Sequence, residues 1–197
     1  AVDRFLRDWK VRHNTVVDGN TAHLVVGDSD WQLPIPVVKN ASGWQFDIKE
    51  AAEEILTREI GRNELAAIEA LHAYVDAQQS YFAMNQTYAR KIVSSEGKKD
   101  GLYWPASPGE MPSPLGPAFS PKEPGAGYHG YRFRILPDKN GFAMVAWPVS
   151  YGQTGVMSFV INQDDKVYQA NLGSESQQKA QALTSYSPDK AWQPVTP

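Results

Sequence analysis

Residues 63–85, NELAAIEALHAYVDAQQSYFAMN, form the longest stretch that lacks Gly and Pro and also carries a helical repeat. Two neighbouring apolar stripes run along it at helical spacings. The first stripe contains Leu65, Ile68, Leu71, Val75 and Phe82, and the second contains Ala66, Ala70, Ala73, Ala77 and Tyr81. We therefore predict a helix that begins at the capping residue Asn63, is buried on more than one side and supports the rest of the chain.

The residues that follow this helix predict an antiparallel sheet. Apolar, strand-like runs occupy residues 131–136, 142–147, 156–161 and 166–170, and turn-forming sequences separate them. Short connections make consecutive strands antiparallel neighbours. A polar helical run at residues 174–183 follows the last strand. The sequence therefore predicts an α+β fold in which the long helix packs on a four-stranded antiparallel sheet.

The amino-terminal part predicts a smaller module. Residues 1–13 have a helical pattern, and strand-like runs at 21–26, 31–38 and 43–48 predict a three-stranded β-meander. Trp44 and Phe46 alternate with polar residues, as in a strand with one buried face. A second helix is expected over residues 47–60, with Gly61 ending it. The boundary Gly61-Arg62 then divides the chain into modules 1–61 and 62–197.

A proline-rich segment interrupts the second module. Residues 101–127 hold seven of the 14 prolines and five of the 15 glycines, which excludes regular structure. Its interleaved aromatic residues predict a long loop that is fixed to the core rather than a free linker. Residues 88–94, just before it, are expected to form a short helical turn.

Composition excludes several classes of function. The chain has 197 residues, of which 42% are hydrophobic and 21% charged, with a net charge of −3, so nothing favours nucleic-acid binding. The absence of cysteine excludes disulfides, thiol catalysis and thiolate metal sites. No stretch approaches the roughly 20 apolar residues of a membrane span. We expect no cofactor.

The four histidines suggest catalysis only weakly. None has a partner at metal-ligand spacing, so no metal site is predicted. His129 lies among glycines and aromatic residues before a strand and, with Tyr128, Arg132 and His72, forms the candidate catalytic group. For each histidine the alternative interpretation is structural. No serine nucleophile motif or phosphate-binding loop is present.

Aromatic residues suggest a binding groove. The candidates for lining it are Tyr103, Trp104, Tyr128, Tyr131 and Trp147. Such a groove would suit a polymer, a sugar or a proline-rich partner. The alternative is that these side chains attach the proline-rich loop to the sheet.

A series of motifs gives the chain a family resemblance. In order along the sequence they are WQLPIPVVK, WQFDIKEAAEEIL, IGRNELAAIEALHAYVDAQQSY, GKKDGLYWP, SPLGP, GYHGYRFRIL, GFAMVAWP, YGQTGVMSFVIN and VYQANLG. Together these motifs resemble, almost end to end, the bacterial family of unknown function DUF2950. The resemblance implies an exported protein with a signal peptide upstream and no established activity. It also implies that the connection at residues 137–140 is shorter here than in most members.

Two weaker resemblances concern the modules separately. The second module is similar to the soluble domains of type IV pilins and pseudopilins, which place a helix across an antiparallel sheet. The hydrophobic half-helix by which pilins assemble is missing, so filament formation does not carry over. The first module resembles part of the NTF2-like fold, by analogy alone.

These observations lead to a primary hypothesis and two alternatives. The primary hypothesis is a non-enzymatic, exported envelope protein, periplasmic or extracellular, that binds an envelope protein, a peptide or a glycan, or assembles with itself. The first alternative is a hydrolase or lyase with its site around His129. The second is a structural subunit of an extracellular filament.

Overall fold

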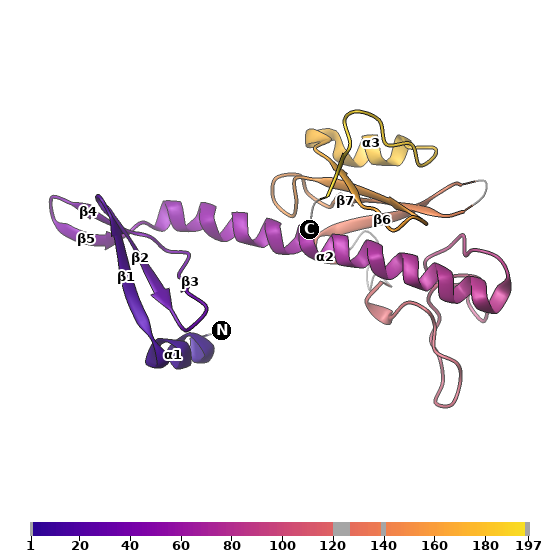
Figure 1. Cartoon of the computed structure of the whole chain (residues 1–197), viewed down its shortest axis with the longest axis horizontal. Coiled ribbons are helices and arrows are strands. Elements are labelled where there is room, and N and C mark those ends of the chain that lie inside the picture. Colours follow the sequence, from indigo (N-terminus) through magenta and orange to yellow (C-terminus); the bar gives the residue numbers. More distant parts are fainter. Residues whose placement is uncertain (1, 120–126, 139–140, 196–197) are drawn as a thin grey trace. The chain divides into compact units, whose positions relative to one another are not determined.

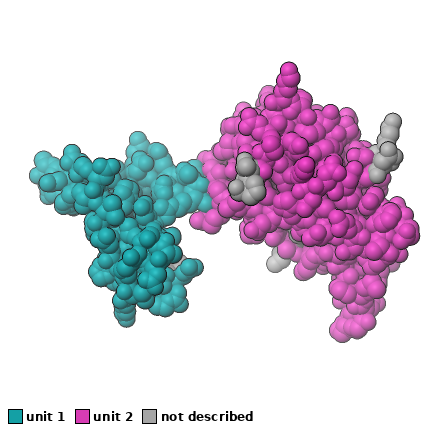
Figure 2. Space-filling view, viewed as in Figure 1, with its two compact units in different colours: residues 1–59 teal, residues 60–197 magenta. Residues whose placement is uncertain are grey.

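The computed structural model describes residues 2–119, 127–138 and 141–195 (Figure 1). Residues 120–126 of the proline-rich loop and residues 139–140 of the connection 137–140 lie outside the described residues. The chain forms two compact units, unit 1 with residues 1–59 and unit 2 with residues 60–197 (Figure 2). None of the described helices has the length and apolarity needed to cross a bilayer.

Unit 1 contains helix α1 (Val2–Val11) and a five-stranded antiparallel sheet. The strands are β1 (His13–Asp18), β2 (Thr21–Val26), β3 (Trp31–Gln32), β4 (Val37–Asn40) and β5 (Gly43–Phe46). Four of them follow the order β1-β2-β4-β5, and β3 pairs with β2. The meander was therefore predicted with too few strands. Strand β1 was missed because all six of its residues are exposed, so no apolar alternation marks it.

The strand register assigns the side chains of unit 1 to two faces. Directly paired residues share a face, so Val17, Ala22, Val37 and Phe46 form one row across β1, β2, β4 and β5. Helix α1 lies on this face, where the rings of Trp9 and His13 stack at 4.0 Å. We call it the α1 face.

The first turns of helix α2 (Ile48–Asn85) meet the opposite face of the unit 1 sheet. The helix begins after Asp47, whose Oδ1 accepts a hydrogen bond from the Glu50 amide at 3.1 Å. Arg58 then holds the helix to the sheet, because its Nη1 donates to the Gln32 carbonyl at 2.6 Å. We call this the α2 face.

Helix α2 is one continuous helix of 38 residues, so the predicted break at Gly61 is wrong. A glycine inside a helix costs only about 1 kcal/mol relative to alanine, which the flanking turns outweigh. Asn63, the expected cap, instead donates its Nδ2 to the Thr154 carbonyl at 3.0 Å. Glu64 accepts hydrogen bonds from the Val156 and Met157 amides at 2.9 Å each. Asn63 and Glu64, whose polar side chains suggested the start of a helix, therefore make tertiary hydrogen bonds instead.

Unit 2 has the predicted α+β arrangement, with one more strand than expected. Its antiparallel sheet has the order β10-β9-β8-β7-β6. The strands are β6 (Tyr131–Leu136), β7 (Ala143–Pro148), β8 (Ser158–Asn162), β9 (Tyr168–Ala170) and the two-residue β10 (Gln193–Pro194). Strand β10 comes from the carboxyl-terminal tail, which has too little apolar pattern to be recognised.

The unit 2 sheet is buried on both faces. Helix α2 covers one face with Leu71, Tyr74 and Val75, which pack among the side chains of Tyr131, Phe142, Met144, Phe159 and Ile161. Helix α3 (Ser176–Ala182) and the tail cover the other face. Arg134 fixes the end of α3, because its Nη2 donates to the carbonyls of Ala180 and Leu183 at 2.8 Å each. The sheet therefore lies between two layers.

The described part of the proline-rich loop is fixed to the core as predicted. Leu102, Trp104 and Leu115 are buried in the cluster under α2. Apart from the 3-10 turn η1 (Pro117–Phe119), residues 101–119 hold no helix. The helical turn expected at 88–94 is wrong. Its residues pair with the loop instead, since the Tyr103 amide donates to the Ile92 carbonyl and the Ser94 amide to the Tyr103 carbonyl, both at 2.8 Å.

The second stripe of the long helix provides a stability test. Ala70 is 3% exposed, so Ala70→Leu inserts three extra carbon atoms into a filled space. We expect a loss of about 1–3 kcal/mol in the free energy of unfolding, measured by urea denaturation. The control is Ala52→Leu at an exposed position of the same helix. Equal stability of the two variants would contradict close packing at Ala70.

Candidate functional site

The candidate catalytic residues do not come together. His129 is exposed in the turn before β6, with a positive φ of 46°, and its ring contacts Tyr128 at 4.4 Å. His72 lies on α2 and places Nδ1 2.7 Å from Oδ1 of Asp165, beyond the end of β8. These positions lie beside opposite ends of β7, roughly 17 Å apart along the strand. Arg132 donates to Gln177 at 2.7 Å on the α3 side of the sheet.

The five aromatic residues predicted to line a groove do not share a surface. Trp104, Tyr131 and Trp147 are 5%, 0% and 4% exposed, and only Tyr103 and Tyr128 are half-buried. Tyr131 packs in the cluster under α2, whereas Trp147 packs under α3 on the other face. Burial raises the pKa of Tyr131 above its ordinary value, so its hydroxyl stays a neutral donor to the Met157 carbonyl at 2.8 Å.

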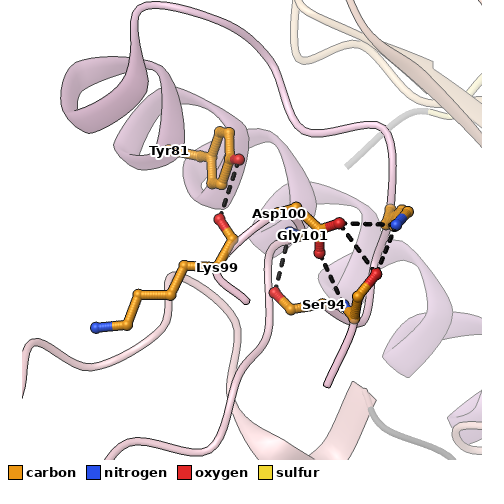
Figure 3. A network of polar contacts seen from close by, with 7 residues as sticks. Tyr81, Ser94, Lys99, Asp100 and Gly101 are labelled. Carbon is orange, nitrogen blue, oxygen red and sulfur yellow. Dashed lines mark hydrogen bonds and ion pairs between the residues drawn. The ribbon is translucent and has the colours of Figure 1, made fainter. Parts of the chain in front are cut away.

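A polar network surrounds Asp100, just before the proline-rich loop (Figure 3). In this network Ser95 lies between Lys91 and Asp100. Ser95 Oγ lies 2.7 Å from Lys91 Nζ and 3.0 Å from Asp100 Oδ2. A serine beside a lysine is one arrangement of a nucleophile and its base. Here Lys91 Nζ also donates to Asp100 at 2.8 Å, so it acts as a charged donor rather than a base.

The same network holds residues 94 and 95 to residues 100 and 101 and fixes this segment to helix α2. Asp100 also accepts from the Ser95 amide at 2.7 Å, and Ser94 Oγ accepts from the Gly101 amide at 2.9 Å. Tyr81 on α2 donates to the Lys99 carbonyl at 3.2 Å, which ties the loop to the helix (Figure 3). The geometry therefore supports a structural clamp. The sequence did not predict this clamp, because serine, lysine and aspartate carry no periodic signal.

The clamp predicts a pH effect on stability. The hydrogen bond from Lys91, with that from the Ser95 amide, holds the pKa of Asp100 well below its usual range. A lowered folded-state pKa means that the stabilisation is present above the unfolded-state pKa, about 3.9. It is lost as the pH falls from there through the folded-state pKa. Asp100→Asn should therefore be less stable than wild type at neutral pH, and this difference should shrink below about pH 4.

Urea denaturation across this pH range measures the effect of Asp100→Asn. The control is Asp76→Asn on the exposed side of α2, because Asp76 has no side-chain hydrogen bond or ion pair within the described part of the chain. A stability difference for Asp100→Asn that does not vary with pH would contradict the clamp.

A cavity of about 200 Å³ lies on the α2 face of unit 1. It is lined by His23, Gln32, Leu33, Pro36, Glu50, Glu54 and Arg58. Arg58 Nε lies 2.7 Å from Glu54 Oε1, and its Nη1 is bound to Gln32. The one cation of the cavity wall is thus already neutralised. Within residues 2–119, 127–138 and 141–195, no group of three or more His, Asp or Glu side chains suits a metal ion.

The exposed apolar side chains concentrate in unit 1. Within the described residues, ten of the 16 exposed large apolar side chains belong to unit 1, although it is the smaller unit. They are Val2, Leu6, Val11, Val16, Val17, Trp31, Trp44, Phe46, Ile48 and Ile55. Unit 1 therefore presents more apolar surface than its own helices cover.

Besides Trp31, three of these side chains lie on the strands of the α1 face. Trp44 and Phe46 are two residues apart on β5, and Val17 lies at the other end of the row that contains Phe46. Their exposed fractions are 46%, 52% and 57%. The expectation that Trp44 and Phe46 lie on a buried face is therefore wrong. Helix α1 contacts the part of this face near His13 and Trp31 and leaves β5 uncovered. We call Trp44 and Phe46 the aromatic platform.

Together, the two antiparallel sheets and the long helix α2 define a mixed α+β protein with one open sheet and one sheet buried on both faces. The chain belongs to the family described as protein of unknown function (DUF2950), whose model matches residues 1–140 and 138–195. The two matches meet at the connection between β6 and β7, where a shorter connection is expected in this chain. No curated protein and no solved structure matches the chain. The likenesses to pilins and to the NTF2-like fold stay predictions.

Proposed function

We propose that this chain is a non-enzymatic binding protein of the bacterial envelope, exported to the periplasm or beyond, and that unit 1 carries its recognition surface. Units 1 and 2 act in this proposal as separate functional modules. The aromatic platform is the observation that supports it most strongly. Apolar surface exposed in a folded chain costs free energy, and a patch with tryptophan and phenylalanine is typical of a contact site.

The chemistry of the platform suits a flat or extended ligand. Trp44 and Phe46 present two rings on one side of a strand, and Lys39 lies with Nζ 5.9 Å from the centre of the Trp44 ring. Rings in this arrangement stack on the apolar face of a sugar or on the side chains of an extended peptide. We therefore propose a peptide or a glycan of the envelope as the ligand class.

A screen of the full chain against peptide and glycan arrays tests the proposal. The double variant Trp44→Ala/Phe46→Ala should bind the best ligand at least about tenfold more weakly, because two apolar anchors are removed. The matched control is Phe82→Ala/Met84→Ala, which removes two apolar side chains from unit 2 that are 37% and 41% exposed. The proposal fails if the wild type binds nothing on either array, or if both double variants lose the same affinity.

A further inference from the structure

Strand β1 has a free edge. Within the described residues it pairs only with β2, and it forms one end of the strand order. The Gly27 amide donates to the Arg12 carbonyl at 2.9 Å, which sets the alternation of hydrogen bonds along the ladder. By this alternation Asn14, Val16 and Asp18 bond to β2. The backbone groups of His13, Thr15 and Val17 therefore point away from the sheet.

The usual protection of an edge strand is weak in β1. The strand has no proline, no lysine and no bulge, and its register with β2 is unbroken over six residues. Val16 and Val17 lie on opposite faces and are 47% and 57% exposed. One outward amide is engaged, since Thr15 donates to its neighbour Asn14 Oδ1 at 2.8 Å. An edge of this kind is a template for another strand.

The sequence of β1 is complementary to itself in antiparallel orientation. When two copies pair about a two-fold axis at Thr15, residue 14 faces 16 and residue 13 faces 17 of the other copy. Arg12 of each copy then faces Asp18 of the other, so opposite charges meet at both ends of the pair. Asp18 has no ion pair within the described residues of its own chain, whereas Arg12 contacts Asp30. The threonines meet at the axis, which is a favourable cross-strand pair.

We propose that unit 1 binds a second copy of this chain through β1, and that the two sheets join edge to edge into one continuous sheet. The occupant of the edge is thus another β1 in antiparallel orientation, centred on Thr15. The contact is isologous and closed, so it yields dimers rather than filaments. It is independent of the aromatic platform residues Trp44 and Phe46, which lie on β5 at the opposite edge.

Sedimentation equilibrium of the full chain, from micromolar to sub-millimolar concentration, tests this contact. We expect a monomer–dimer equilibrium. Val17→Pro removes an outward amide and leaves the bonds between β1 and β2 in place, so the dimer dissociation constant should rise at least about tenfold. The matched control is Val17→Thr, which keeps the amide and should stay dimeric. Circular dichroism checks that both variants are folded.

A charge swap gives a second test that does not depend on proline. Asp18→Lys should weaken the dimer, because it then faces Arg12 of the other copy, and Arg12→Glu/Asp18→Lys should restore it. A wild type that sediments as a monomer throughout overturns the proposal. A Val17→Pro variant that dimerises as strongly as Val17→Thr also overturns it. So does a wild-type chain whose strand β1 binds peptides from the array but does not bind a second copy of the chain. Trp44→Ala/Phe46→Ala should dimerise normally, which separates this test from that of the proposed function.

Discussion

Replacing Gln78 by alanine is expected to lower the free energy of unfolding by about 4 kcal/mol. The Gln78 side chain is fully buried and makes three hydrogen bonds. Its Nε2 donates to the Ala89 carbonyl at 2.9 Å and to the Tyr74 hydroxyl at 3.0 Å, and its Oε1 accepts from the Ala89 amide at 2.9 Å. Alanine leaves both backbone groups of Ala89 without partners in the core and adds a cavity.

Tyr74 increases the loss of stability, because its buried hydroxyl loses the hydrogen bond that Gln78 Nε2 donates to it. Burial raises the pKa of Tyr74 well above its ordinary value, so its hydroxyl remains protonated and donates to the Ala143 carbonyl at 3.2 Å. The control is Gln79→Ala, the same chemical change one position along α2 at an exposed residue, where we expect almost no change. Urea denaturation measures both variants. A loss below about 1 kcal/mol for Gln78→Ala would mean that water reaches Ala89.

Gly155→Ala is expected to cost about 3 kcal/mol, the upper part of the range for overpacking. A Cβ at this position would lie 2.5 Å from Cζ and 2.7 Å from Cε2 of Tyr131, closer than van der Waals contact allows. The Tyr131 ring is fully buried and packs on Phe159 at 5.8 Å. Its hydroxyl is bound to the Met157 carbonyl, so the ring has no free space into which it can move.

The same substitution at Gly61 is the matched control and has the opposite expected sign. Apart from its chain neighbours and the backbone of its own helical turns, no atom lies within 4 Å of the position that a Cβ would take at Gly61, and this residue is inside the continuous helix α2. Gly61→Ala should therefore raise stability by about 0.5–1 kcal/mol. Thermal denaturation compares the two variants. A destabilised Gly61→Ala would contradict an unbroken helix, and an unchanged Gly155→Ala would contradict the close contact with Tyr131.

The secondary structure of unit 2 was predictable because periodicity and burial coincide there. The limits of β6 match those expected, and the inward side chains of β6, β7 and β8 alternate with those that face α3. Gly61 and Asn63 were misleading for a physical reason. A glycine followed closely by an asparagine is typical of one helix ending and another beginning, but here Asn63 donates to the Thr154 carbonyl and Glu64 accepts from the Val156 amide. Local sequence cannot specify such distant partners.

The candidate site was harder to predict than the fold. Aromatic residues near glycine and proline suggested a groove in unit 2, yet Tyr131 and Trp147 pack on opposite faces of its sheet. Trp44 and Phe46 have the alternation of a half-buried strand, and the same pattern occurs when that face is left uncovered. Only the sheet order, which places β5 at an edge away from α1, distinguishes the two cases. The sequence signal that could have identified this site is the pair of aromatic residues Trp44 and Phe46 on a short strand that follows turn-forming residues.

Hydrogen–deuterium exchange of the full chain tests most directly whether unit 1 is the recognition surface. The comparison is between the free chain and the chain saturated with the tightest peptide or glycan from the arrays. We predict slower exchange in residues 37–46, which carry Trp44 and Phe46, and no change in residues 101–118 or 128–132. Protection confined to residues 128–132, around His129, would contradict the account and would favour a site in unit 2.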